Sequence, residues 1–85
     1  GKKLEAVVFL HLRKRHHEVC YWRKNGEVDL VTSDETGITP YQISWEGIKP
    51  RHEAALKEFY DAFPQANPAV LVTQSNAELF LKTER

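Results

Sequence analysis

The sequence lacks several features that would assign it to a familiar class of protein. Cys20 is its single cysteine, so the chain cannot form an internal disulfide, which fits a reducing compartment. No stretch approaches the roughly 20 consecutive apolar residues of a membrane-spanning helix, and no signal peptide is visible. A glycine-rich phosphate loop is also missing, which excludes ATP binding through that motif. These absences predict a cytoplasmic protein without membrane partners.

Charge of one sign is not in excess either. Twelve Lys and Arg residues balance twelve Asp and Glu residues, so no overall basic field attracts nucleic acid. The 85 residues, 41% of them apolar, suffice for one small domain with a thin core. Because the chain begins with Gly1 and enters helical sequence at once, we expect residues 1–85 to be a single domain of a longer chain.

Two segments show the spacing of amphipathic helices. Residues 3–15 contain no Gly or Pro, and Leu4, Val8 and Leu12 recur at helical intervals, although adjacent valines leave a strand as the alternative. Pro50 suits the first turn of a second helix, which is expected to run to Phe63. The apolar face of this helix consists of Leu56, Phe59, Tyr60 and Phe63.

A β-hairpin is predicted between these helices. Residues 18–24 and 27–33 are rich in β-branched and aromatic residues, and Asn25-Gly26 between them predicts a two-residue type I′ turn. Such a turn fixes the register of the two strands. The pairs that it places opposite each other are Lys24 with Glu27, Trp22 with Asp29, and Tyr21 with Leu30.

The remaining strands predict the fold class. Residues 38–45 form a third strand, in which Pro40 suggests an edge position or the start of the strand. Residues 69–73 are a continuous apolar run, as in a buried parallel strand, and residues 78–82 are expected to add a last short strand. The class is therefore α/β. The expected order is a helix, a three-strand antiparallel meander, a crossover helix and a last strand, and the strands form one mixed sheet.

The third strand raises the main chemical question. Because side chains alternate along a strand, Gln42 and Ser44 face one way, and Asp29 converges with them beside Trp22 if it shares that face. A phosphodiester nuclease needs carboxylates there to hold Mg²⁺, and Asp29 with Glu5 of the first helix could supply two ligands. Gln42 is neutral, however, and Ser44 cannot replace a lysine. The alternative is that Asp29 is an ordinary strand carboxylate, satisfied by solvent or by the Trp22 indole.

Other candidate groups carry weaker signals. A basic run, Arg13, Lys14 and Arg15, could contact nucleic acid together with Arg23, and the alternative is a solvated helix end. Cys20 is expected to be an inert buried residue, and both tryptophans are expected in the core or on a sheet face. The histidines do not have metal-binding spacing with Cys20 and are expected on the surface; they are His11, His16, His17 and His52.

Several segments together resemble a known module. They are Leu4-Glu5, Tyr21-Trp22-Arg23, residues 26–31, residues 40–44 and residues 70–73. The module is the C-terminal domain of unknown function that follows the AAA+ ATPase module in many prokaryotic ATP-binding proteins. That domain is similar to the PD-(D/E)xK restriction-endonuclease-like superfamily. The resemblance covers nearly the whole chain, and it implies a restriction-endonuclease-like core.

The resemblance also assigns site positions. Glu5 would be the helix carboxylate, Asp29 the first strand carboxylate, Gln42 the residue at the Glu position and Ser44 the residue at the Lys position. Glu46 and Lys49 do not restore the missing lysine, because three residues apart on a strand they would face opposite ways. Lys57 of the second helix is a possible substitute without support from spacing.

The departures at Gln42 and Ser44 both remove charge, so the resemblance implies a non-catalytic accessory domain of a cytoplasmic ATPase. Its expected partners are the rest of the ATPase chain and either nucleic acid or another protein. No catalytic residue and no cofactor are expected. The alternative is a residual nuclease that uses Glu5 and Asp29 to hold Mg²⁺ or Mn²⁺.

Overall fold

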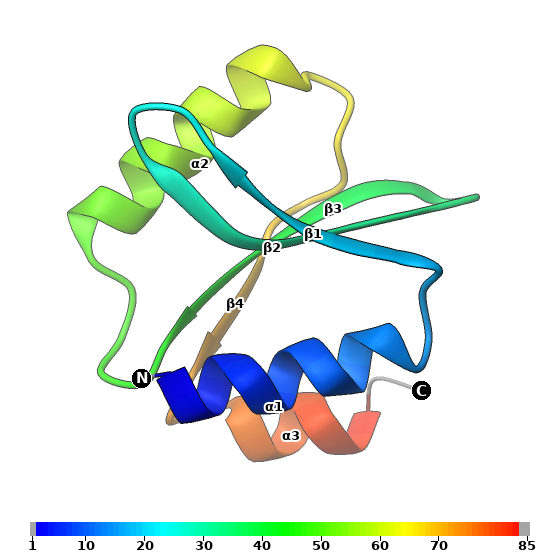
Figure 1. Cartoon of the computed structure of the whole chain (residues 1–85). Coiled ribbons are helices and arrows are strands. Elements are labelled where there is room, and N and C mark those ends of the chain that lie inside the picture. The colour runs from blue at the N-terminus through cyan, green and yellow to red at the C-terminus, as the bar shows by residue number, and fades with distance from the viewer. Residues whose placement is uncertain (1, 84–85) are drawn as a thin grey trace.

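A mixed four-stranded sheet lies between two helical layers (Figure 1). The computed structural model describes residues 2–83 of the chain. In chain order the elements are α1 (Lys2–Arg13), β1 (Glu18–Arg23), β2 (Glu27–Asp34), β3 (Gly37–Ser44), α2 (Pro50–Ala62), β4 (Val70–Thr73) and α3 (Ala77–Thr83). The strand order is β1-β2-β3-β4, with antiparallel pairing up to β3 and parallel pairing of β3 with β4. The predicted α/β class and mixed sheet are confirmed.

Each face of the sheet has its own apolar cluster. On one face, α1 and α3 cover the sheet, and Leu4, Val8 and Leu12 of α1 pack against buried residues of β2, β3 and β4 (Figure 1). On the other face, Phe59 of α2 is 1% exposed and packs against Val28 and Val31 of β2. The helical spacing that predicted α1 and α2 thus corresponds to the buried faces of both helices.

The C-terminal segment differs from the prediction. Residues 78–82 are part of helix α3, not of a fifth strand. After β4 the chain turns, with Asn76 N–H donating to Thr73 O over 3.2 Å, and the first helical hydrogen bond joins Phe80 N–H to Asn76 O. Ala77 and Phe80, three residues apart, then lie against the same cluster as α1. Alternating and helical patterns cannot be distinguished in so short an apolar segment.

The β1–β2 hairpin keeps the predicted register at one end only. Cys20 pairs with Val31 as expected, but the register then shifts by one, so Trp22 pairs with Val28 and Arg23 with Glu27. The predicted pairs of Trp22 with Asp29 and Lys24 with Glu27 are therefore wrong. The turn between Arg23 and Glu27 contains three residues, 24–26, rather than two, and within it Lys24 N–H donates to Gly26 O over 2.9 Å.

Gly26 has a packing role rather than the conformational role that the type I′ prediction gave it. Within residues 2–83, only Gly37 and Gly47 have positive φ angles, so Asn25-Gly26 does not form a type I′ turn. A Cβ atom on Gly26 would lie 2.8 Å from Cβ of Ala55 in α2. The glycine lets the turn approach the helix, and the Glu58 carboxylate accepts hydrogen bonds from both Asn25 and Gly26.

Pro40 does not mark an edge of the sheet, because β3 lies between β2 and β4. It pairs with Val31 on one side, and the parallel pairing with β4 begins only at Tyr41 on the other. The absence of an N–H group at Pro40 therefore removes no hydrogen bond from the sheet. The backbone before it is also covered, since Asn67 N–H donates to Ile38 O over 2.8 Å.

Candidate functional site at Asp29 and Gln42

Asp29 lies at a β-bulge, which redirects its carboxylate. Asp29 and Leu30 of β2 together oppose Tyr21 of β1, where the register shifts. On the other side of β2, Asp29 Oδ2 accepts a hydrogen bond from Ile43 N–H over 2.7 Å. The side chain thus replaces a backbone ladder bond between β2 and β3, as bulges often permit near functional sites.

Gln42 is fully buried, and both the oxygen and the nitrogen of its side-chain amide form hydrogen bonds. Its Oε1 accepts from Asp29 N–H over 3.0 Å. Its Nε2 donates to Glu27 O over 2.8 Å and to His52 O over 3.2 Å. Only this orientation of the amide matches one N–H group with the oxygen and two carbonyls with the nitrogen. Gln42 therefore joins β2, β3 and the start of α2, and its oxygen is directed at the backbone.

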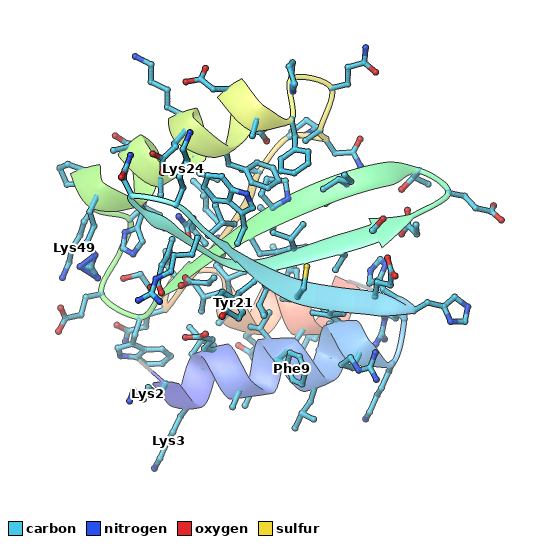
Figure 2. The ribbon with its side chains drawn as sticks, turned by 45° about the horizontal axis from the view of Figure 1, so that its top comes forward. Lys2, Lys3, Phe9, Tyr21, Lys24 and Lys49 are labelled. Carbon is cyan, nitrogen blue, oxygen red and sulfur yellow. The ribbon has the colours of Figure 1, made fainter. Side chains whose placement is uncertain are left out.

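Three carboxylates line one small cavity beside the bulge. This carboxylate pocket has a volume of about 260 Å³ and is lined by Glu5 of α1 and by Glu27 and Asp29 of β2. Phe9 and Tyr21 contribute to its walls, and Figure 2 shows them on α1 and β1 on the same side of the molecule. The structure therefore brings together Glu5 and Asp29, which the sequence analysis singled out, and adds Glu27.

The environment of this pocket disfavours negative charge. Burial raises the pKa of Glu5 above its ordinary value, and the charges of Asp29 and Glu27 raise it further. Burial also raises the pKa of Asp29, with a smaller contribution from Glu27, although the hydrogen bond from Ile43 acts in the opposite direction. Carboxylates with raised pKa values that share a cavity are typical of functional sites.

A second cavity adjoins Asp29 on the α2 side. This Arg51 hollow, of about 450 Å³, is lined among others by Arg23, Glu27, Asp29, Arg51 and His52. The charge of Arg51 opposes the rise in the pKa of Asp29. Asp29 thus lies between an acidic cavity and one that contains two arginines.

His52 is buried, 7% exposed, which contradicts the expectation that all four histidines lie on the surface. Its Nδ1 accepts from Lys49 N–H over 2.8 Å at the start of α2, so the neutral ring carries its proton on Nε2. Burial lowers the pKa of His52, and Arg51 lowers it further. Near neutral pH His52 is therefore a neutral hydrogen-bond donor in the Arg51 hollow.

The remaining site positions lie elsewhere. Ser44 lines a third cavity, the Trp45 groove, and neither of the cavities at Asp29. Glu46 and Lys49 lie on the loop after β3 and form an ion pair of 3.4 Å, so the expectation that they face opposite ways is wrong. Lys57 is exposed on α2 and lines neither cavity at Asp29.

The basic residues predicted to bind nucleic acid do not form one cluster. Arg13 and Arg15 donate to backbone carbonyls four residues away at the end of α1, over 3.0 and 3.2 Å, and Lys14 between them is exposed. Arg23 lies at the opposite end of β1, a strand that is roughly 17 Å long. There it forms an ion pair of 3.5 Å with Glu27.

Two further expectations about single residues are wrong. Cys20 is exposed, not buried, and lines the carboxylate pocket. Trp22 packs edge-on against Phe59 at 5.4 Å as a core residue does, but Trp45 is 47% exposed.

Sharing a cavity does not make Glu5, Glu27 and Asp29 a metal-binding cluster. In the part of the chain that the structure describes, no group of three or more His, Cys, Asp or Glu residues is arranged to hold a metal ion. Over the same residues, no helix combines the length and apolar character needed to cross a bilayer.

Comparison with known proteins places the chain in a family. A family model described as Domain of unknown function (DUF4143) matches residues 1–84. The chain belongs to the DUF4143 family. Searches of curated proteins and of solved structures gave no significant match.

Glu27, Arg51 and His52 were not predicted as site residues. Arg51 and His52 contribute through a contact between segments distant in sequence, since α2 begins beside the bulge of β2. One signal was available for the last two, because Pro50-Arg51-His52 places a cation and a ring nitrogen in the first turn of a predicted helix. For Glu27 a signal was available too, because it lies two residues before Asp29 on one strand and alternation places both side chains on one face.

Proposed function

We propose that this DUF4143 domain is a non-catalytic, nuclease-like accessory domain of a prokaryotic AAA+ ATP-binding protein, acting through contacts with protein or nucleic acid. Support for the fold comes from the element order, in which α1, the β1–β3 meander, α2 and β4 follow the restriction-endonuclease-like sequence of elements. Support for the ATPase comes from the sequence resemblance. The domain would then serve its parent chain by binding and not by hydrolysis.

The hydrogen bonding of Gln42 carries the proposal. A nuclease of the type that the chain resembles would have a metal-binding carboxylate here, directed at Asp29. Gln42 instead donates to two backbone carbonyls and accepts from the Asp29 N–H group. A carboxylate could not make both donations, because when ionised it has no proton to donate. Glutamine at this position therefore fits a structural centre better than a metal site.

A residual metal-dependent nuclease is the second candidate, and the carboxylate pocket favours it. Glu5, Glu27 and Asp29 share that pocket, and the raised pKa values of Glu5 and Asp29 support this candidate, because a bound cation would offset their negative charges. Mg²⁺ or Mn²⁺ would be held by Glu5 and Asp29 and would activate a water molecule.

A cleavage assay separates the two candidates. The purified chain is incubated with single- and double-stranded DNA and RNA in the presence of Mg²⁺ or Mn²⁺. We expect no cleavage above the level of an Asp29→Ala variant. Asp61→Ala serves as a matched control, since Asp61 is an exposed carboxylate on α2. Cleavage that persists in Asp61→Ala and is abolished in Asp29→Ala would overturn the non-catalytic proposal.

Nucleic-acid binding through Arg13, Lys14, Arg15 and Arg23 stays a separate prediction. It requires an affinity that falls steeply with salt and that drops when two of these residues become alanine. The separation of Arg23 from the other three argues for at most local contact with phosphate groups at either end of β1.

A further inference from the structure

The largest cavity described above lies away from Asp29. The Trp45 groove has a volume of about 1020 Å³ and lies between the start of α1, the start of α3 and the loop after β3. Its apolar lining comes from Leu4, Val7, Trp45, Ala77 and Leu81. Trp45 and Val7 are each 47% exposed, so the groove presents large apolar side chains to solvent. Such a surface, with a polar rim, is typical of an interaction site.

The loop that carries Trp45 is fixed by backbone hydrogen bonds. Gly47 N–H donates to Ser44 O over 3.1 Å, which closes a turn around Trp45 and Glu46. Gly47 adopts a φ of 119°, a conformation that L side chains rarely adopt. Gln74 N–H also donates to Trp45 O over 3.2 Å, which ties the loop to the chain after β4. The backbone that carries Trp45 is therefore held in place before any partner binds, which lowers the entropic cost of binding.

The rim of the groove is positively charged. Lys2, Lys3, Lys49 and Arg51 line it, whereas its two acidic residues, Glu46 and Glu78, each form an ion pair with a lysine. Among the described residues, Lys2, Lys3 and Arg51 form no ion pair. Figure 2 shows Lys2 and Lys3 at the start of α1 and Lys49 on the same side of the molecule. The N-termini of α1 and α2 add positive partial charge there.

We propose that the Trp45 groove binds an acidic, apolar peptide segment of a partner protein. Large apolar side chains of the segment would pack against Trp45, Val7 and Leu81, and its Asp or Glu residues would pair with Lys2, Lys3 and Arg51. Single-stranded nucleic acid is disfavoured, because successive bases stack on successive aromatic side chains and Trp45 is the one aromatic residue in this lining. The inference rests on the proposed function, since it names a partner class for a binding domain.

The test is a titration of the ¹⁵N-labelled chain with three probes. The first is a synthetic 16-residue helical peptide with Leu on one face and Glu on the other. The second is the same peptide with every Glu replaced by Lys, and the third is an oligonucleotide of twelve deoxythymidines. We expect the acidic peptide to shift the Trp45 indole signal saturably and the other two probes to leave it unchanged. The Trp22 indole, packed on Phe59, is the internal reference.

Two variants show whether binding occurs in the groove. Lys3→Glu is expected to weaken the acidic peptide about five- to tenfold, whereas Lys57→Glu, the same change at an exposed lysine of α2, leaves the affinity unchanged. Trp45→Ala should abolish the shifts of α1 and α3 signals, with an unchanged Trp22 signal as proof of folding. Absence of shifts at millimolar acidic peptide, or equal shifts with the basic peptide or the oligonucleotide, would overturn the proposal. This test reads the signals at Trp45, whereas the proposed non-catalytic function is tested by metal binding and cleavage at Asp29. Failure of one proposal can therefore be distinguished from failure of the other.

Discussion

The side chain of Gln42 connects three elements through hydrogen bonds that require an amide. It is 0% exposed, so each backbone group that it satisfies would otherwise be buried without a partner. An unsatisfied buried polar group costs about 1–3 kcal/mol, and a buried unpaired charge costs more. A glutamate at position 42 would thus be a destabilising change here, although it would restore the nuclease-like residue type.

Gln42→Glu is expected to lower the free energy of unfolding by about 3 kcal/mol or more at pH 7. The introduced carboxyl group would have a raised pKa in the folded state, so the penalty for its charge is absent at low pH and appears as pH rises through that pKa. Urea unfolding between pH 4 and pH 8 measures both effects. Gln42→Met is the control: it leaves all three backbone partners unpaired, so it should also cost about 3 kcal/mol or more, but this loss should not change with pH. A Gln42→Glu variant as stable as the parent at pH 7 would show that the centre is not structural.

Asp29→Asn tests the electrostatics of the carboxylate pocket. Since the pKa of Asp29 is raised on folding, the aspartate stabilises the fold only below its unfolded pKa, and that contribution is lost as pH rises through the folded value. Asparagine can still accept the hydrogen bond from Ile43 N–H. The variant should therefore be more stable than the parent at pH 7, by less than about 1 kcal/mol given partial exposure. The two stabilities should converge toward pH 3; a variant less stable at pH 7 would refute the assigned charge environment.

At the scale of elements, the turn between β1 and β2 is fixed by its contact with α2. Gly26 permits the close approach to Ala55, and hydrogen bonds from Gly26 and Asn25 lower the pKa of Glu58. This docking sets the longer turn, and the longer turn accompanies the register shift that forms the bulge at Asp29. The position of the candidate site therefore depends on a contact about thirty residues away in sequence.

Gly26→Ala is expected to destabilise the fold by about 1–3 kcal/mol, because its Cβ would lie 2.8 Å from the Ala55 Cβ. Ala55→Gly alone should cost about 1 kcal/mol through helix propensity. The double variant should be less destabilised than the sum of the two, with a coupling of about 1 kcal/mol measured by thermal unfolding. Strict additivity would show that the turn does not pack against α2 as described.

Sequence periodicity predicted the helices whose buried face follows from the spacing of apolar residues within the helix itself. Leu4, Val8 and Leu12 of α1, and Phe59 of α2, fall on buried faces because helical spacing alone decides which side is apolar. The hairpin register could not be predicted, since Asn25-Gly26 has the composition of a type I′ turn and only α2 determines the turn that forms. Residues 78–82 are too short for periodicity to separate strand from helix.

At the scale of the whole molecule, the N-termini of α1 and α2 and the start of β2 lie on the same side of the molecule (Figure 1). The candidate site and the Trp45 groove both lie there, and Arg51 lines both the groove and the hollow beside Asp29. Glu5 and Asp29 could be predicted from the resemblance. Glu27 could have been added from strand alternation, because it lies two residues before Asp29 on β2. Arg51 and the groove could not be predicted, because they arise from the packing of α1, α2 and α3 on this side of the molecule.

The most direct measurement is a Mn²⁺ titration of the ¹⁵N-labelled chain, followed through paramagnetic broadening of backbone amide signals. We expect no localised broadening at millimolar Mn²⁺ around Glu5, Asp29 and Gln42, because the Gln42 oxygen is directed at the Asp29 N–H group. Broadening centred on these residues, and lost in Asp29→Ala but not in Asp61→Ala, would show a retained metal site. That result would contradict a purely structural role for Gln42 and would favour the residual nuclease.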